Sequence, residues 1–306
     1  MKKSLVLLLL SSLVSGLYAR QPRTVVEPPF AFRNSGTLEI ERIELAPEST
    51  TVYIQAYFRP HNWIRISSEP YIRTGAEGEK LTVRSADGMP LDTEFYMPET
   101  GRHDFSLSFP PVDPKTAKID LIESDCPDCF KIYDIDLTGK KAKPGRSALA
   151  KKYKKAAPLT ENFTAPVVSD SPARIAGAIT GYDPRFFDRI EIAFYSPIVG
   201  DGATELSVPV REDGSFETGL NILTPIRGML FLPGFVTLPF YAEPGRETAL
   251  EIDLGAVYRK TSVFKELHPQ TSPVAYYGEL GRVNEELARL QKIQIRTGPL
   301  HIGYHF

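Results

Sequence analysis

Two cysteines, Cys126 and Cys129, are the residues whose spacing most directly suggests chemistry. They are the only cysteines among 306 residues, and they stand in a C-x-x-C pattern. That spacing supports thiol–disulfide exchange when one thiol lies at a helix N-terminus or beside a positive charge that stabilises the thiolate. Here Asp125 and Asp128 place negative charge beside the sulfurs, and a strand pattern follows. We therefore predict a structural disulfide, with a redox-active pair as the alternative interpretation.

The segments that flank the cysteines are predicted to form a hairpin. Alternating apolar residues enter at 118–122 and leave at 130–137, and the phase slips by one residue near Tyr133 and Asp134, which indicates a β-bulge. Pro127 favours a type I turn whose end Cα atoms lie closer than about 7 Å, within reach of a disulfide. Because the closed loop is so short, the bond should stabilise the fold by only about 2 kcal/mol.

Carboxylates are concentrated around the same hairpin, and they are the residues most suited to a calcium ion. They are Asp120, Glu123, Asp125, Asp128, Asp134 and Asp136. Their spacing differs from that of an EF-hand loop, so we predict a solvated acidic edge and no metal site.

The rest of the sequence offers few further candidates for catalysis. It contains no G-x-S-x-G elbow, no phosphate-binding loop, no dinucleotide fingerprint and no H-E-x-x-H pair. His301 and His305 are close enough in sequence to share a metal, but Pro299 and Gly303 disfavour the helix that would align them. We predict no catalytic residue and no cofactor. A hydrolase whose carboxylates are brought together only by the fold is the alternative among enzymes.

The first 19 residues have the pattern of an export signal. Lys2 and Lys3 precede an apolar stretch at 5–17, and residues 17–19 offer a cleavage site with a small final residue. The apolar stretch is too short to span a bilayer, so we predict an exported protein of the periplasm or cell envelope without a transmembrane segment. Removal of the two lysines leaves 34 basic residues against 38 acidic ones, a net charge near −4 that argues against nucleic-acid binding.

The body of the chain has the composition of β structure. Hydrophobic residues make up 42% of the whole chain, and its 26 prolines and 22 glycines interrupt short alternating runs. We predict an all-β fold of two immunoglobulin-like β-sandwiches in tandem, over residues 25–138 and 174–255. The clearest strand runs from Val52 to Phe58. Trp63, the only tryptophan, is expected in the first core rather than as a ligand platform.

A basic, proline-rich linker is predicted over residues 139–173. Its lysines and arginine at 140–155 form a run without an acidic residue. Two interpretations stay open: a solvated linker, and contact with an anionic envelope surface.

The chain is predicted to end in an amphipathic helix over 273–293, followed by a tail at 294–306. Apolar residues recur there at alternating spacings of four and three, which makes one stripe on a helix. The stripe consists of Tyr276, Leu280, Val283, Leu287 and Leu290. It is expected to bind either the second sandwich of the same chain or a partner, which would be a second copy or a separate protein.

Several motifs of the first sandwich resemble one known family. They are the segments at 40–43, 57–66, 95–101 and 125–132, with the sequences IERI, YFRPHNWIRI, FYMPETG and DCPDCFKI. They look like the N-terminal region of TlpA-type thioredoxin-like disulfide reductases of Gram-negative gut anaerobes. The second sandwich is similar to the module named domain of unknown function 4369 (DUF4369), which often precedes the catalytic domain of those proteins.

The resemblance implies a role and also a difference. The reductases carry a W-C-x-x-C motif in a C-terminal thioredoxin domain, whereas this sequence has one tryptophan and no cysteine after Cys129. The expected function is therefore that of an exported accessory or binding protein without intrinsic catalysis. The alternatives are a thiol–disulfide enzyme that uses Cys126 and Cys129, and the truncated product of a thioredoxin-like oxidoreductase gene.

Overall fold

The computed structural model describes residues 22–127, 129–139, 165–196, 202–234, 236–264 and 272–297, with side chains up to residue 290. The expected signal peptide at 1–19, the basic run at 140–155, and residues 298–306 of the expected tail lie outside this part. Strands dominate the described residues, which contain only two helices, so the predicted all-β class is confirmed. Neither helix has the length and apolar character needed to cross a bilayer.

The first domain consists of two five-stranded sheets and a two-stranded ribbon. Their orders are β1-β3-β4-β10-β8, β2-β12-β11-β6-β7 and β5-β9. The strands are β1 (Arg23–Val26), β2 (Phe32–Arg33), β3 (Leu38–Leu45), β4 (Thr50–Tyr57), β5 (Trp63–Ile64), β6 (Tyr71–Arg73), β7 (Leu81–Thr82), β8 (Ser85–Asp87), β9 (Phe95–Tyr96), β10 (Arg102–Phe109), β11 (Lys118–Ile122) and β12 (Lys131–Asp136).

Alternation along the strands builds the core between the two large sheets. Val52 and Ile54 of β4 lie opposite Leu107 and Phe105 of β10, and all four side chains are buried. The predicted bulge is confirmed, because Ile119 and Leu121 pair with residues 135 and 132, which leaves Tyr133 and Asp134 opposite a single residue. Asp134 takes a left-handed backbone conformation there, with a φ of 54°.

The second domain consists of two four-stranded sheets, in the orders β16-β13-β19-β20 and β15-β14-β17-β18. The strands are β13 (Ala173–Thr180), β14 (Arg189–Tyr195), β15 (Ala203–Pro209), β16 (Ser215–Leu220), β17 (Ile226–Leu232), β18 (Val236–Ala242), β19 (Glu247–Asp253) and β20 (Val274–Tyr277). The first and last strands of the predicted region, β13 and β19, pair in parallel. Buried residues of both sheets, such as Ile175 and Leu230, share one core.

The predicted helix over 273–293 begins too early. Residues Val274–Tyr277 form strand β20, in which Val274 pairs with Ile252 and Tyr276 with Leu250 of β19. Strand pairing overrides the helical spacing because the edge of β19 offers unpaired backbone groups and two tyrosines favour extended backbone. Gly278, with a φ of 74°, turns the chain, and helix α2 (Gly281–Thr297) follows.

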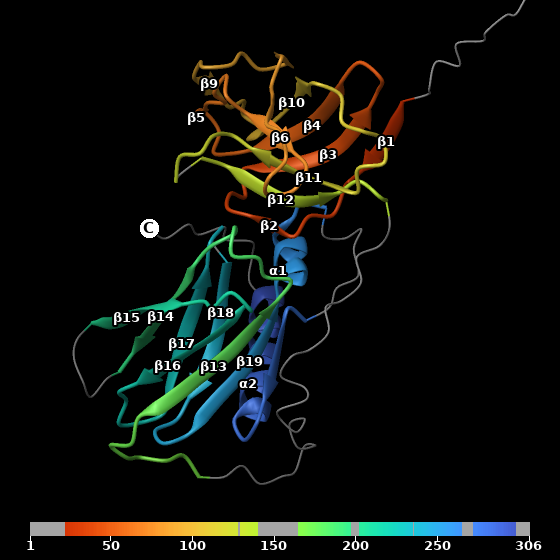
Figure 1. The fold of residues 1–306 in the computed structure, drawn as a ribbon. Coiled ribbons are helices and arrows are strands. Elements are labelled where there is room, and N and C mark those ends of the chain that lie inside the picture. Colours follow the sequence, from red (N-terminus) through yellow and green to blue (C-terminus); the bar gives the residue numbers. More distant parts are fainter. Residues whose placement is uncertain are drawn as a thin grey trace, which may run out of the picture.

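A second helix, α1 (Leu254–Thr261), was missed by the sequence analysis. It follows directly on β19, and the Asp253 carboxylate accepts a hydrogen bond from the Ala256 amide at 2.9 Å, which caps its first turn. In Figure 1, α1 lies where the two domains meet, directly below β2 of the first domain. The two domains therefore share an interface to which α1 contributes.

Candidate functional site

The cysteine turn is closed by a disulfide. Cys126 and Cys129 are bonded, and their Cα atoms are 5.3 Å apart, the distance expected of a tight turn. Strands β11 and β12 enter and leave the turn, so the described residues on both sides of the sulfurs lead into extended strands and do not begin a helix. The cysteines thus sit at the end of a hairpin, which is how the sequence analysis placed them.

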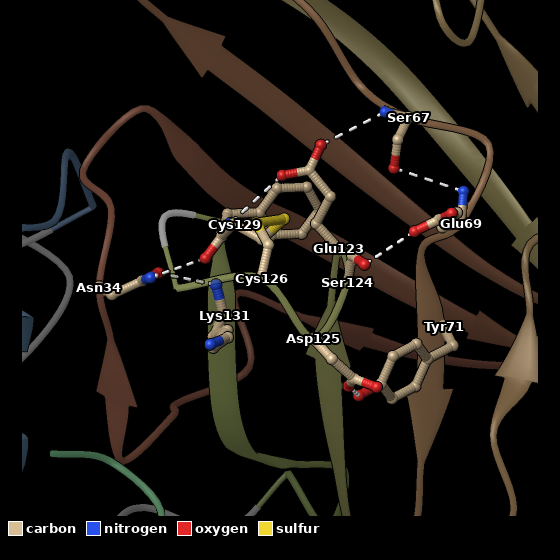
Figure 2. Close-up of a disulfide and its surroundings, with 11 residues drawn as sticks. Asn34, Ser67, Glu69, Tyr71, Glu123, Ser124, Asp125, Cys126, Cys129 and Lys131 are labelled. Carbon is tan, nitrogen blue, oxygen red and sulfur yellow. Dashed lines mark hydrogen bonds between the residues drawn. A yellow bond between two sulfur atoms is a disulfide. The ribbon is translucent and has the colours of Figure 1, made fainter.

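Hydrogen bonds from two other segments hold this turn (Figure 2). Asn34 donates from Nδ2 to the Cys129 carbonyl at 2.8 Å and accepts from the Lys131 amide at 2.7 Å. Glu123 accepts from the Phe130 amide at 3.3 Å and from the Ser67 amide, also at 3.3 Å. The turn is therefore fixed to the chain before β3 and to the loop after β5, an arrangement suited to a structural link.

We expect the double variant Cys126→Ser/Cys129→Ser to fold and to lose about 1–3 kcal/mol of unfolding free energy, because the bond closes only a short loop. Urea unfolding followed by circular dichroism measures this loss. The wild-type chain treated with dithiothreitol is the control and should match the variant. Loss of the folded state in the variant would show that the bond does more than link a hairpin.

Three of the acidic residues around the hairpin, Asp120, Asp125 and Asp134, are bound by arginine or lysine side chains. Asp125 accepts from Lys80 Nζ at 2.7 Å and from the Tyr71 hydroxyl at 2.9 Å, and these two bonds hold the pKa of Asp125 below its usual value. Among the described residues, no group of three or more His, Cys, Asp or Glu side chains is placed to hold a metal ion. Asp128 lies outside the described residues.

Arg185, from the loop between β13 and β14, links the two domains electrostatically. Its guanidinium donates to Asp120 at 2.9 Å and to Asp134 at 3.1 Å in the first domain, and to Asp183 at 3.0 Å in its own. Arg73 also donates to the buried Asp120, at 3.2 Å. The hydrogen bond between Arg185 and Asp183 is the main cause of a raised pKa at Arg185 and of a lowered pKa at Asp183. Three of the predicted acidic-edge groups thus serve folding contacts: Asp120, Asp125 and Asp134.

A second link between the domains is buried. Arg33 and Glu39, both with 2% of their side chains exposed, form an ion pair at 2.6 Å. Arg33 also donates to Thr261 Oγ1 at 3.2 Å, and Ser262 at the end of α1 donates to Glu39 at 3.1 Å. This pair therefore connects β2 and β3 of the first domain to α1 of the second.

Aromatic rings surround the same junction. Phe32 is 1% exposed, stacks on Phe186 at a centroid distance of 5.1 Å and meets Tyr258 of α1 edge-on at 5.2 Å. Phe32 and Tyr133 belong to the same buried cluster as the core of the second domain. The interface between the domains is thus an extension of a hydrophobic core.

Two of the five residues predicted to form a partner-binding stripe do not lie on the helix. Tyr276 and Leu280 are buried in the second domain and precede α2, so they are not part of a helical face. Val283 and Leu287 are half-buried, and Leu290 is 54% exposed. The physical reason is that β20 joins the sheet and draws the start of the stripe into the core.

A polar residue, Asn284, fixes α2 to the second domain. Its side chain accepts from the Tyr241 amide at 2.7 Å and donates to the Tyr241 carbonyl at 3.1 Å, as a strand partner of β18 would. It is 2% exposed. The described part of α2 therefore packs on its own chain, the alternative that the sequence analysis set beside a partner.

We expect Val283→Asp/Leu287→Asp to lower the melting temperature without changing the mass in ultracentrifugation, because two charges would be placed at half-buried positions of α2. Glu285→Ala, on the exposed side of α2, is the control and should leave the melting temperature unchanged. An unchanged melting temperature together with a loss of self-association would instead assign the helix to a partner.

The expectation that Trp63 lies in the core is wrong. Its side chain is 49% exposed, and it pairs across the ribbon with Tyr96, which is 61% exposed. Ile64 points the other way and is buried, so the apolar face of β5 is formed by Ile64. The alternation of Trp63 and Arg65 with Ile64 and Ile66 could have revealed this, since period-2 alternation places Trp63 with the charged residue.

The similarity of this chain to known proteins is weak. No family profile and no curated protein matches this chain. Among solved structures, pullulanase type I from Bacillus subtilis str. 168 complexed with maltose is 9% identical, with a TM-score of 0.25, and the match covers 63% of this chain and 23% of that one. Pullulanase from Anoxybacillus sp. LM18-11 complexed with maltotriose is 7% identical, with a TM-score of 0.24, over 63% and 24%. The chain thus spans about a quarter of those proteins, and no argument rests on so weak a likeness.

Proposed function

We propose that this chain is an exported accessory or binding protein of the cell envelope, without a catalytic site of its own. It is built of two immunoglobulin-like β-sandwiches that are joined as one unit. The observation that carries the proposal is that the side chains best suited to chemistry already make structural contacts. The two cysteines close a hairpin turn, and the neighbouring carboxylates of Asp120, Asp125 and Asp134 bind arginine and lysine side chains.

The interface supports a binding role because it fixes the orientation of the two domains. Arg185 reaches two carboxylates of the first domain, and Phe32 is enclosed by aromatic rings of the second. Interfaces between domains that move relative to one another are usually small and polar. A junction that is hydrophobic at its centre suits a protein that presents a surface of fixed shape. The predicted export signal and the resemblance to the N-terminal region of TlpA-type proteins support the envelope location.

A screen of the purified chain against glycan, peptide and ester substrates tests the absence of catalysis. We expect no turnover above that of the heat-denatured chain. Reproducible turnover that is lost on substitution of one carboxylate or serine would contradict the proposal and would identify the catalytic residue at the same time.

A further inference from the structure

Trp63 and Tyr96 form an exposed aromatic pair on the β5–β9 ribbon, which Figure 1 shows at the end of the first domain that faces away from the second. Directly opposed residues of an antiparallel pair lie on the same face, with Cβ atoms about 4.5–5.5 Å apart. Both side chains therefore leave the ribbon on the same face, and both are largely exposed to solvent. An exposed aromatic pair offers two apolar ring surfaces on which the apolar face of a ligand can stack.

The ribbon is held firmly from below. Ile64 is buried, Phe95 lies against the His103 ring at a centroid distance of 4.1 Å, and the Met97 side chain is 2% exposed. The Met97 amide donates to the Asn62 carbonyl at 2.9 Å. Because the backbone and the underside are fixed, the positions from which the two aromatic side chains project are pre-organised, which lowers the conformational-entropy cost of binding a ligand.

The size of the pair favours a small ligand over a protein. An aromatic side chain offers about 150–250 Å² of surface, so the exposed parts of the two rings amount to roughly 200 Å². A stable protein interface needs about 800 Å² from each partner. Two aromatic side chains at this cross-strand spacing match instead the apolar C–H faces of two successive sugar units, since the spacing is comparable to the rise of one hexose along a glycan.

The charge around the pair favours an uncharged ligand. Two exposed arginines, Arg59 and Arg65, are balanced by two exposed glutamates, Glu94 and Glu99, on the segments that carry the rings. Glu94 accepts from the Tyr96 hydroxyl at 3.1 Å, and Glu99 lies 3.2 Å from His61. Such groups can exchange hydrogen bonds with hydroxyl groups at the rim of the aromatic faces.

We infer that Trp63 and Tyr96 bind a linear, neutral hexose glycan, with two successive sugar rings stacked on the two aromatic rings and their hydroxyls bonded at the charged rim. This assignment rests on the proposed function of a binding protein, and it names the ligand class that one surface of that protein takes.

The single tryptophan of the chain makes the test direct, because all tryptophan fluorescence comes from this site. Full-length protein is titrated with cellohexaose, maltohexaose, laminarihexaose and mannohexaose, each to about 10 mM, which detects binding as weak as Kd about 1 mM. We expect a saturable blue shift with at least one of them, because stacking removes water from Trp63. Tyr96→Ala should weaken this binding by about tenfold, and Tyr96→Phe should retain it, since the ring supplies the contact.

Tyr195→Ala is the matched control, since Tyr195 is a strand tyrosine of the second domain with 54% exposure. It should bind the sugar as the wild-type chain does. No saturable shift with any of the four sugars, or a shift that is unchanged in Tyr96→Ala, would overturn the inference. Self-association in ultracentrifugation that is lost in Tyr96→Ala would overturn it in favour of a protein contact. Cleavage of a bound sugar would contradict the proposed absence of catalysis and leave the binding site in place.

Discussion

Phe32→Ala is expected to lower the free energy of unfolding by about 3–5 kcal/mol, the range for removal of a fully buried aromatic side chain. Phe32 is 1% exposed and stands between Phe186 and Tyr258 of the second domain. Its loss leaves a cavity at the centre of the interface. Urea unfolding measures the effect, and we expect one transition in the wild-type chain to separate into two as the domains lose their coupling.

Phe231→Ala is the control for this experiment, since Phe231 lies on strand β17 with 39% of its side chain exposed. It should lower the free energy of unfolding by well under half as much as Phe32→Ala does, because little packing is removed. If Phe32→Ala costs less than about 1 kcal/mol and unfolds in one unchanged transition, then the interface does not hold the domains together.

Glu39→Ala should lower the free energy of unfolding by a similar amount, about 3–5 kcal/mol, because it leaves the Arg33 guanidinium buried without its counter-charge. The Glu39 carboxylate accepts from Arg33, Ser262 and the Val263 amide, so three donors lose their acceptor at once. Chemical denaturation of the purified variant gives the loss.

Two further variants separate the ion pair from simple loss of a charge. Glu41→Ala removes a half-exposed carboxylate that pairs with Arg42 on the surface, and it should cost less than about 1 kcal/mol. Arg33→Leu/Glu39→Leu removes both charges and should recover much of the loss, since no unpaired charge remains buried. A double variant as unstable as Glu39→Ala would mean that the hydrogen bonds, and not the charge balance, are what the junction needs.

Features with strict alternation were predictable from the sequence. The strand at 52–58 appears as β4, and the phase slip at Tyr133 and Asp134 appears as a bulge, because period-2 burial is a local property of the chain. The cysteine turn was predictable for the same reason, as its geometry depends on four consecutive residues.

Contacts between distant segments were not predictable. Arg185 and Asp120 are 65 positions apart, and nothing in either neighbourhood marks the other as its partner. The stretch at 273–280 has the apolar spacing of a helix and residues that favour a strand. Its residues 274–277 form a strand because the edge of β19 pairs with them. The alternation of Trp63 with Ile64 favours a solvent position for Trp63, whereas the general tendency of tryptophan favours burial, and the structure follows the alternation.

Insulin reduction tests most directly whether the cysteine pair is a structural link in a non-catalytic protein. Purified chain is added to insulin with dithiothreitol, and the turbidity of the precipitating B chain is followed over time. The account predicts the same rate with the wild-type chain, with Cys126→Ser/Cys129→Ser and with buffer alone. A faster rate with the wild-type chain that disappears in the double variant would contradict it and would make Cys126 and Cys129 a redox centre.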